Sequence, residues 1–95
     1  MKILWTKAAA EDLDKIEIYI FKDNPGSAVN QVLRIIKAVE HYLSANPGMG
    51  RWGRLPKTRE FVISGTPFIV IYRIKNNILE IIRVLHGAQQ WPGKH

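Results

Sequence analysis

The sequence predicts an α+β domain in which an antiparallel two-helix hairpin packs on an antiparallel β-sheet. Two observations lead to this fold class. Apolar residues recur at helical spacing through the first half, and three strand-like runs follow one another in the second half. The chain has 95 residues and no cysteine, which predicts one domain over residues 1–95 without disulfide bonds. The predicted element order is β-α-α-β-β-β.

A short strand and two helices are expected in the first half. The strand covers residues 1–6, and Thr6 then caps a helix that runs to about Lys22. Asn24-Pro25 starts a second helix that runs to about Ala45. The two helices bury apolar stripes, formed by Leu13, Ile16, Ile18, Ile20 and Phe21 in the first and by Val29, Val32, Leu33, Ile36, Val39 and Leu43 in the second. The two-residue break between them predicts a hairpin.

Three strands and a basic loop are expected in the second half. Residues 46–57 form a loop rich in glycine and proline, and strands are predicted at 58–64, 68–75 and 78–86. Asn76-Asn77 predicts a tight turn, because asparagine tolerates positive φ. The strands should form a meander. Apolar residues fall on both faces of the last two strands, so both faces are expected to be partly covered.

The positive charge is confined to one half of the chain. The net charge is +6, yet residues 1–50 carry six basic and six acidic residues. Residues 51–95 carry eight basic residues, five of them arginine, against Glu60 and Glu80. This asymmetry indicates an acidic partner, either a nucleic acid or an acidic protein segment. The alternative is a basic surface that only keeps the protein in solution.

Several side chains are candidates for a functional role, each with a structural alternative. Arg73 and Arg83 leave apolar strands, where each either pairs with Glu60 or Glu80 or faces a cleft. His86 ends the last strand as a possible acid or base, or as a hydrogen-bonding strand terminator. Trp52 and Trp91 are interaction anchors, stacking platforms for bases, or caps on the edge of the core.

Other site classes are not indicated. His41, His86 and His95 do not have the spacing of a shared metal site, and no glycine-rich phosphate loop opens a helix. We therefore expect neither metal nor cofactor. No apolar run reaches the ~18 residues of a membrane span, and the N-terminus does not resemble a signal peptide. A cytoplasmic protein without membrane contact is expected.

The motifs, taken in order, resemble the RelE/ParE superfamily of toxins from type II toxin–antitoxin systems. The resemblance spans nearly the whole chain. It rests on the segments Trp5-x-x-x-Ala9-x-x-Asp12-Leu13-x-x-Ile16-x-x-Tyr19-Ile20, Pro47-x-x-Gly50-Arg51-x-Gly53-Arg54, Thr58-Arg59-Glu60-Phe61-Val62-Ile63, Pro67-Phe68-Ile69-Val70-Ile71-Tyr72-Arg73-Ile74 and Ile82-Arg83-Val84-Leu85-His86-Gly87-Ala88-Gln89-x-Trp91-Pro92. It implies a fold of two helices on an antiparallel sheet, in agreement with the order predicted above.

The superfamily implies two mechanisms. RelE-type members cut mRNA on the ribosome, whereas ParE-type members poison DNA gyrase. Where RelE-type nucleases typically carry cations, this sequence has Glu60, Val62 and Ile69, and its last strand resembles the ParE branch. The resemblance therefore favours a ParE-like gyrase poison, with a RelE-like mRNA interferase as the alternative and a non-toxic antitoxin-binding protein as a third reading.

The resemblance also implies partners and site residues. The partners are a cognate antitoxin and DNA gyrase, or the ribosome and mRNA under the alternative, with no sequence-specific DNA binding by this chain alone. The expected target surface consists of Arg59, Arg73, Arg83, His86, Gln89 and Trp91. The arginines expected to meet acidic groups of the antitoxin are Arg54, Arg59 and Arg73. Under the nuclease alternative the catalytic set is Arg59, Arg73, Arg83 and His86.

Overall fold

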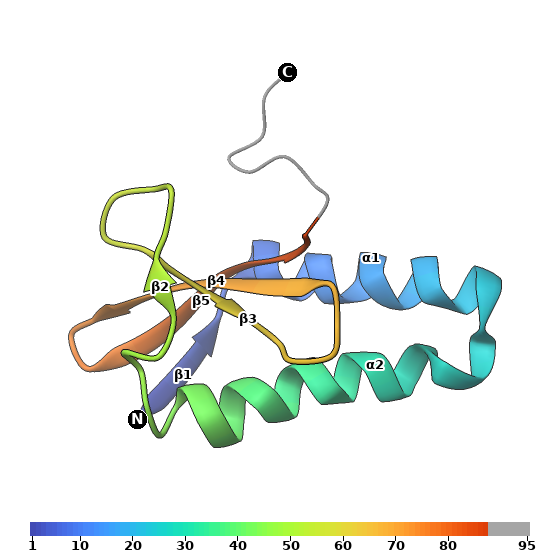
Figure 1. Cartoon of the computed structure of the whole chain (residues 1–95), viewed down its shortest axis with the longest axis horizontal. Helices are drawn as coiled ribbons and strands as arrows, with labels where there is room; N and C mark the ends of the chain where they lie inside the picture. Colours follow the sequence, from blue (N-terminus) through green and yellow to red (C-terminus); the bar gives the residue numbers. More distant parts are fainter. Residues whose placement is uncertain (88–95) are drawn as a thin grey trace.

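A five-stranded sheet carries a two-helix hairpin on one face (Figure 1). The structure is a computed structural model and describes residues 1–87, so Gln89 and Trp91 lie outside the described residues. The elements in chain order are β1 (Lys2–Trp5), α1 (Lys7–Asp23), α2 (Pro25–Lys37), η1 (Ala38–Leu43), β2 (Arg51–Trp52), β3 (Arg59–Val62), β4 (Phe68–Lys75) and β5 (Ile78–His86). The predicted α+β class is confirmed, and β2 is an additional strand inside the segment predicted to be a loop.

The strands are arranged in the order β1-β5-β4-β3-β2. From β2 to β5 each strand is antiparallel to the next, which confirms the predicted meander. The turn between β4 and β5 contains Asn76 and Asn77 with φ of 52° and 61°, as their positions predicted. The first strand, β1, joins the sheet at the far edge, parallel to β5.

A bulge in β5 explains the mixed pattern of the last two strands. Tyr72 pairs with Ile81 but Ile71 pairs with Arg83, so Ile82 is an extra residue. Leu79, Ile81 and Val84 therefore all face the same core. An unbroken alternation along β5 would instead place Val84 on the face opposite to Leu79 and Ile81.

The helical hairpin begins at Thr6, whose side chain accepts a hydrogen bond from the Ala9 amide and confirms the predicted cap. Pro25 starts α2, as predicted. The predicted second helix is divided, because α2 ends at Lys37 and a π-helical segment, η1, continues to Leu43.

The far half of the hairpin is not covered by the sheet. In Figure 1 the two helices extend well past the ends of the strands. Four residues expected to be buried in the apolar stripes are therefore exposed, namely Ile18 at 61%, Phe21 at 59%, Val29 at 55% and Leu33 at 43%. Val39 and Leu43 are buried as predicted, and the other buried positions of the predicted second helix are Ala28, Ile35 and Ala38.

The core lies between the hairpin and the sheet. Tyr72 is its largest fully buried side chain. It packs in one cluster with residues from both layers, namely Ala9, Ile35, Ala38, Val39, Leu43, Ile63, Phe68, Val70, Leu79, Ile81 and Val84. Across residues 1–87, none of the helices is both long enough and apolar enough to cross a bilayer.

Candidate functional site

Arg73 lies on β4 directly opposite Glu80 of β5. Its Nε atom is 2.5 Å from the Glu80 Oε1 atom, and both side chains are partly exposed. The cross-strand ion pair that the sequence suggested is therefore present for Arg73. The guanidinium stays accessible at the surface, because its side chain is 42% exposed.

Arg83 is bound by a residue on the first helix. Its Nε and Nη2 atoms donate to the Asp12 carboxylate at 2.6 and 3.0 Å, and the same carboxylate accepts the Val84 amide at 3.0 Å. The hydrogen bonds from Arg83 to Asp12 hold the pKa of Arg83 above its usual value, against the effect of burial. The expectation that Arg83 pairs with Glu60 or Glu80 was wrong, since α1 places Asp12 against the part of β5 that extends beyond β1.

Glu60 gathers two arginines at the other edge of the sheet. Its side chain is 2% exposed and accepts from the Arg54 backbone amide and Nε atom at 3.1 and 3.2 Å. Arg51 is 3.5 Å from the other carboxylate oxygen. Burial raises the pKa of Glu60, but the hydrogen bonds and charge of Arg54, with a smaller effect of Arg51, outweigh it and hold that pKa below its usual value.

Arg59 fixes the loop between the helices and the sheet. Its Nη1 atom donates to the carbonyl oxygens of Gly50 at 2.7 Å and Gly48 at 3.3 Å. The guanidinium also lies 3.9 Å from the ring centroid of Trp52. Trp52 is 68% exposed, which contradicts the interpretation that it caps the core edge.

Tyr72 holds the same loop from below. Its hydroxyl donates to the Pro47 carbonyl at 2.6 Å and accepts from the Gly50 amide at 2.9 Å. A side chain at Gly50 would place its Cβ 2.6 Å from that hydroxyl, so the close approach requires glycine. Burial raises the pKa of Tyr72, which keeps the hydroxyl protonated and able to donate.

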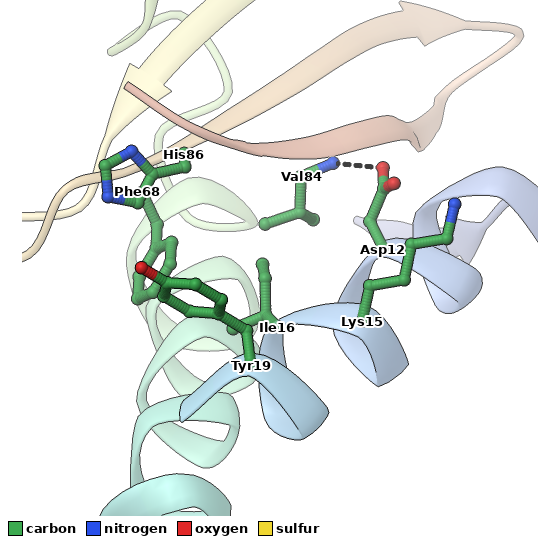
Figure 2. Close-up of a pocket in the computed structure, with 7 residues that line it drawn as sticks. All are labelled: Asp12, Lys15, Ile16, Tyr19, Phe68, Val84 and His86. Atoms are coloured by element: carbon green, nitrogen blue, oxygen red, sulfur yellow. Dashed lines mark hydrogen bonds between the residues drawn. The ribbon is translucent and has the colours of Figure 1, made fainter. Parts of the chain in front are cut away.

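His86 lies in a groove between α1 and the end of the sheet (Figure 2). The groove has a volume of about 480 Å³, and its walls are formed by Asp12, Lys15, Ile16, Tyr19, Phe68, Val84 and His86. The rings of His86 and Phe68 meet edge to face with centroids 6.1 Å apart. Figure 2 shows Tyr19 reaching from α1 toward these two rings, with Asp12 bound to Val84 at the other end.

The groups expected to form one surface lie at different ends of the sheet. His86 is opposite Phe68, whereas Arg59 is opposite Tyr72, four residues further along β4. At about 3.3 Å per residue this is a separation of roughly 13 Å along the strand. Arg73 directly follows Tyr72, the register partner of Arg59, so strand alternation places the Arg59 and Arg73 side chains on opposite faces of the sheet. Arg54 binds Glu60, which follows Arg59 on β3. The structure thus separates the three residues Arg54, Arg59 and Arg73, which we call the cationic edge, from the His86 groove.

The structural roles of two residues, Asp12 and Tyr72, were not predicted from the sequence. Asp12 falls among Ala9, Leu13 and Ile16 on the buried face of α1, and a carboxylate in an apolar stripe was the available signal. Tyr72 gave no such signal, because the spacing that buries it equally suits any large apolar residue.

Comparisons with known proteins identify the family of this chain. The sequence profile of the family described as "ParE toxin of type II toxin-antitoxin system, parDE" matches residues 3–91. The candidate toxin Y4kP of Sinorhizobium fredii is 45% identical over 91 residues, which cover 96% of this chain and 93% of that protein. Two Caulobacter vibrioides proteins are each 30% identical over 88 residues. Toxin RelE2 is matched over 93% of this chain and 97% of its own. Toxin ParE3 is matched over 90% and 86%.

Solved structures show the same fold. A chain of the chromosomal ParDE TA system from P. aeruginosa superposes with a TM-score of 0.79 at 30% identity, covering 90% of this chain and 95% of that one. A chain of the toxin–antitoxin complex RelBE2 from Mycobacterium tuberculosis has a TM-score of 0.68 at 23% identity, with the same coverage, and this second likeness concerns the fold alone. Because the family profile matches most of the sequence, the chain belongs to the ParE toxin family of type II toxin–antitoxin systems.

Proposed function

We propose that the protein inhibits growth by poisoning DNA gyrase through direct contact, and that a cognate antitoxin neutralises it. Family membership supports the toxin–antitoxin role. Relatives named RelE2 and ParE3 are equally similar in sequence, so the choice of target rests on the arrangement of the site.

The observation that favours a contact poison over a nuclease is the dispersal of the cations. A phosphoryl-transfer site needs positive groups converging on the reacting phosphate. Here Arg83 is held by Asp12, Arg73 by Glu80, and Arg59 by two carbonyl groups. His86 lies about four residues along β4 from Arg59. The arginines therefore give the protein a positively charged surface rather than a convergent catalytic site, and such a surface suits binding to another protein.

The proposed target surface is the cationic edge together with the end of β5. Arg59 and Arg73 supply accessible charge, and Arg83 and His86 shape the end of the strand from which the chain continues to Gln89 and Trp91. We retain Gln89 and Trp91 in this surface from their sequence positions.

The antitoxin is proposed to bind apolar surface on the hairpin and acidic groups on the sheet. The groove beside Tyr19 and Phe68 is largely apolar, and the hairpin exposes Ile18, Phe21 and Val29 nearby in sequence. A disordered segment that folds on binding would bury these side chains. Its acidic residues would then meet Arg54, Arg59 and Arg73.

A ribosome-dependent mRNA nuclease is the second candidate, because His86 lines an open groove in which it could move a proton. One parallel assay separates the candidates. Purified protein is tested for inhibition of gyrase supercoiling and for cleavage of mRNA on programmed ribosomes. Gyrase inhibition without cleavage is the expected result, and codon-dependent cleavage without gyrase inhibition would refute the proposal.

The variant His86→Ala sharpens this comparison. Losing a general acid or base costs a nuclease ~10²–10⁴-fold in rate. A contact poison should instead retain most of its activity in this variant. Near-native circular dichroism and thermal unfolding are the required controls, because His86 also packs on Phe68.

A further inference from the structure

The strand pair β2–β3 holds an exposed tryptophan in a fixed position. Trp52 is 68% exposed, and the Arg59 guanidinium lies 3.9 Å from its ring centroid. Arg59 is itself anchored by the carbonyl oxygens of Gly48 and Gly50. A cation over an indole face is attracted to it, and here the cation cannot easily move away. The Trp52 ring is therefore presented to solvent in a preorganised orientation.

The chain segment that carries this ring has only basic charged residues. The segment 46–59 contains four basic residues and no aspartate or glutamate. Arg51 is 68% exposed along its side chain, and Lys57 is exposed. The adjacent carboxylate, Glu60, is buried and held by Arg54 and Arg51. Trp52 and Arg59 share one face of the strand pair, Arg51 leaves the other face beside Glu60, and Lys57 lies in the loop that follows β2. We call this edge of the sheet, with Arg51, Trp52, Lys57 and Arg59, the Trp52 edge.

The backbone beneath the Trp52 edge is held in place. A Cβ at Gly53 would lie 2.8 Å from the Thr58 hydroxyl and 3.1 Å from Glu60 Cγ, so the loop packs directly against β3. The Gly53 amide donates to the Thr58 carbonyl at 2.8 Å. In Figure 1 β2 and this loop lie at the opposite end of the molecule from the connection between α1 and α2. The Trp52 edge is thus separate from the tip of the hairpin.

We propose that the Trp52 edge binds single-stranded nucleic acid, with one base stacked on Trp52 and the flanking phosphates on Arg51, Lys57 and Arg59. Within residues 1–87, the bonds of Arg59 to protein acceptors use only its Nη1 atom, so Nε and Nη2 can donate to a phosphate. Aromatic platforms beside cations are the means by which proteins hold single strands without reading their sequence.

The surroundings of Trp52 favour a nucleic acid over an acidic protein. A tryptophan that anchors a protein interface is ordinarily ringed by contacts that exclude water. The neighbours of Trp52 along β2 are Arg51 and Gly53, and its register partner on β3 is Arg59. These residues supply charge and hydrogen-bond donors but almost no apolar rim. A flat base needs only the ring face and the cations.

The test is direct binding of the purified full chain to labelled oligonucleotides of about 12 nucleotides, measured by fluorescence anisotropy. This length lies within the roughly 4–16 nucleotides that one single-strand-binding OB fold covers. Single-stranded DNA or RNA should bind more tightly than the duplex of the same sequence. Trp52→Ala should weaken binding by about 5-fold or more, because stacking of one base is lost. Trp52→Phe should retain most of the affinity. Arg51→Ala and Lys57→Ala should each reduce the slope of log affinity against log salt by about 0.7.

Matched variants give the controls. Tyr19→Ala removes an aromatic side chain of 66% exposure from α1, and Lys22→Ala removes a cation from the same helix, so neither should change oligonucleotide binding. Equal losses in Trp52→Ala and Tyr19→Ala would overturn the proposal. A polyglutamate peptide provides a second check. If it competes as well as unlabelled oligonucleotide, and if Trp52→Ala weakens peptide and oligonucleotide binding to the same extent, the surface is a protein-docking site and the proposal is overturned. Because the assay contains neither gyrase nor ribosome, its result is independent of the proposed target.

Discussion

Asp12 joins α1 to β5 through one carboxylate that accepts from three nitrogen atoms. It binds two nitrogen atoms of Arg83 and the Val84 amide, which lies on the stretch of β5 that β1 does not cover. The Asp12 side chain is 7% exposed and that of Arg83 is 30% exposed. Removing the carboxylate takes this acceptor away from the buried Val84 amide and from the partly buried Arg83 guanidinium. The loss of a buried hydrogen-bond partner costs about 1–3 kcal/mol of folding free energy.

We therefore predict that Asp12→Ala lowers the free energy of unfolding by about 1–3 kcal/mol, as measured by urea denaturation. The control is Asp14→Ala, an exposed carboxylate two residues away, which should change stability by less than about 0.5 kcal/mol. Asp12→Asn should fall between them, since the amide oxygen can still accept from Val84. Equal stability of the Asp12→Ala and Asp14→Ala proteins would show that the hydrogen bonds of Asp12 to Arg83 and Val84 do not contribute to stability.

Glu60 should make stability depend on pH. Its pKa in the folded protein is lower than the ordinary value of 4.5, so near pH 4 the unfolded chain binds more protons at this group. The stabilisation is complete above pH 4.5 and is lost as the pH falls through the lower folded value. The stability difference between wild type and Glu60→Gln should therefore shrink on acidification below 4.5. The exposed Glu40→Gln variant should show little change, and a Glu60 difference constant with pH would contradict this account.

At the scale of elements, Thr6 connects β1, α1 and β5. Its hydroxyl accepts from the Ala9 amide and lies 2.9 and 3.0 Å from the carbonyl oxygens of Ile81 and Ile82. The side chain thus caps α1 and ties its start to the bulge of β5. Asp12 provides a second side-chain connection, between α1 and β5.

Thr6→Ala should lower the free energy of unfolding by about 1–2 kcal/mol, through loss of the cap and of the bond to β5. Thr6→Ser keeps the hydroxyl and should restore most of that loss. Thermal and urea unfolding of the three proteins provide the measurement. If Thr6→Ser is as unstable as Thr6→Ala, the methyl group rather than the hydroxyl carries the effect.

Elements that neighbouring residues determine were predicted correctly, and features that depend on distant parts of the chain were not. The bounds of β4 and β5 were predicted residue for residue, because apolar runs and the Asn76-Asn77 turn define them locally. The strand β2 was missed, since two residues carry no alternation and are held by Arg59 and Glu60 from β3. The exposure of Ile18 and Phe21 was missed because it depends on how far the hairpin extends past the sheet. The spacing of apolar residues shows which side of a helix is apolar, but not how much of the helix the sheet covers.

The candidate site followed the same rule. The Arg73–Glu80 pair was predictable from neighbouring strands, and it is present. The Asp12–Arg83 pair spans 71 residues and depends on which strand lies beneath α1, so no local spacing could indicate it. The separation of His86 from Arg59 depends on the register of three strands, which the sequence pattern leaves undetermined.

At the scale of the whole molecule, the charge asymmetry becomes a difference between two layers. Residues 1–50, which include the hairpin, carry equal numbers of basic and acidic residues, whereas residues 51–87, which include β2 to β5, carry seven basic and two acidic ones. The shortest dimension of the molecule is 24 Å. The Debye length is about 8 Å at physiological salt, so an approaching acidic partner responds to the nearer layer rather than to the net charge.

Association with the antitoxin should therefore depend on where a charge is changed and not only on its sign. Lys57→Glu and Lys75→Glu alter exposed cations of the sheet layer, while Lys7→Glu and Lys22→Glu make the same change of charge on α1. At low salt, the sheet variants should slow antitoxin association by about 10-fold, because electrostatic steering is lost, and the helix variants should do so much less. Stopped-flow measurements across a salt series provide the comparison. If all four variants slow association equally, net charge alone governs the encounter, and the layered arrangement has no part in recognition.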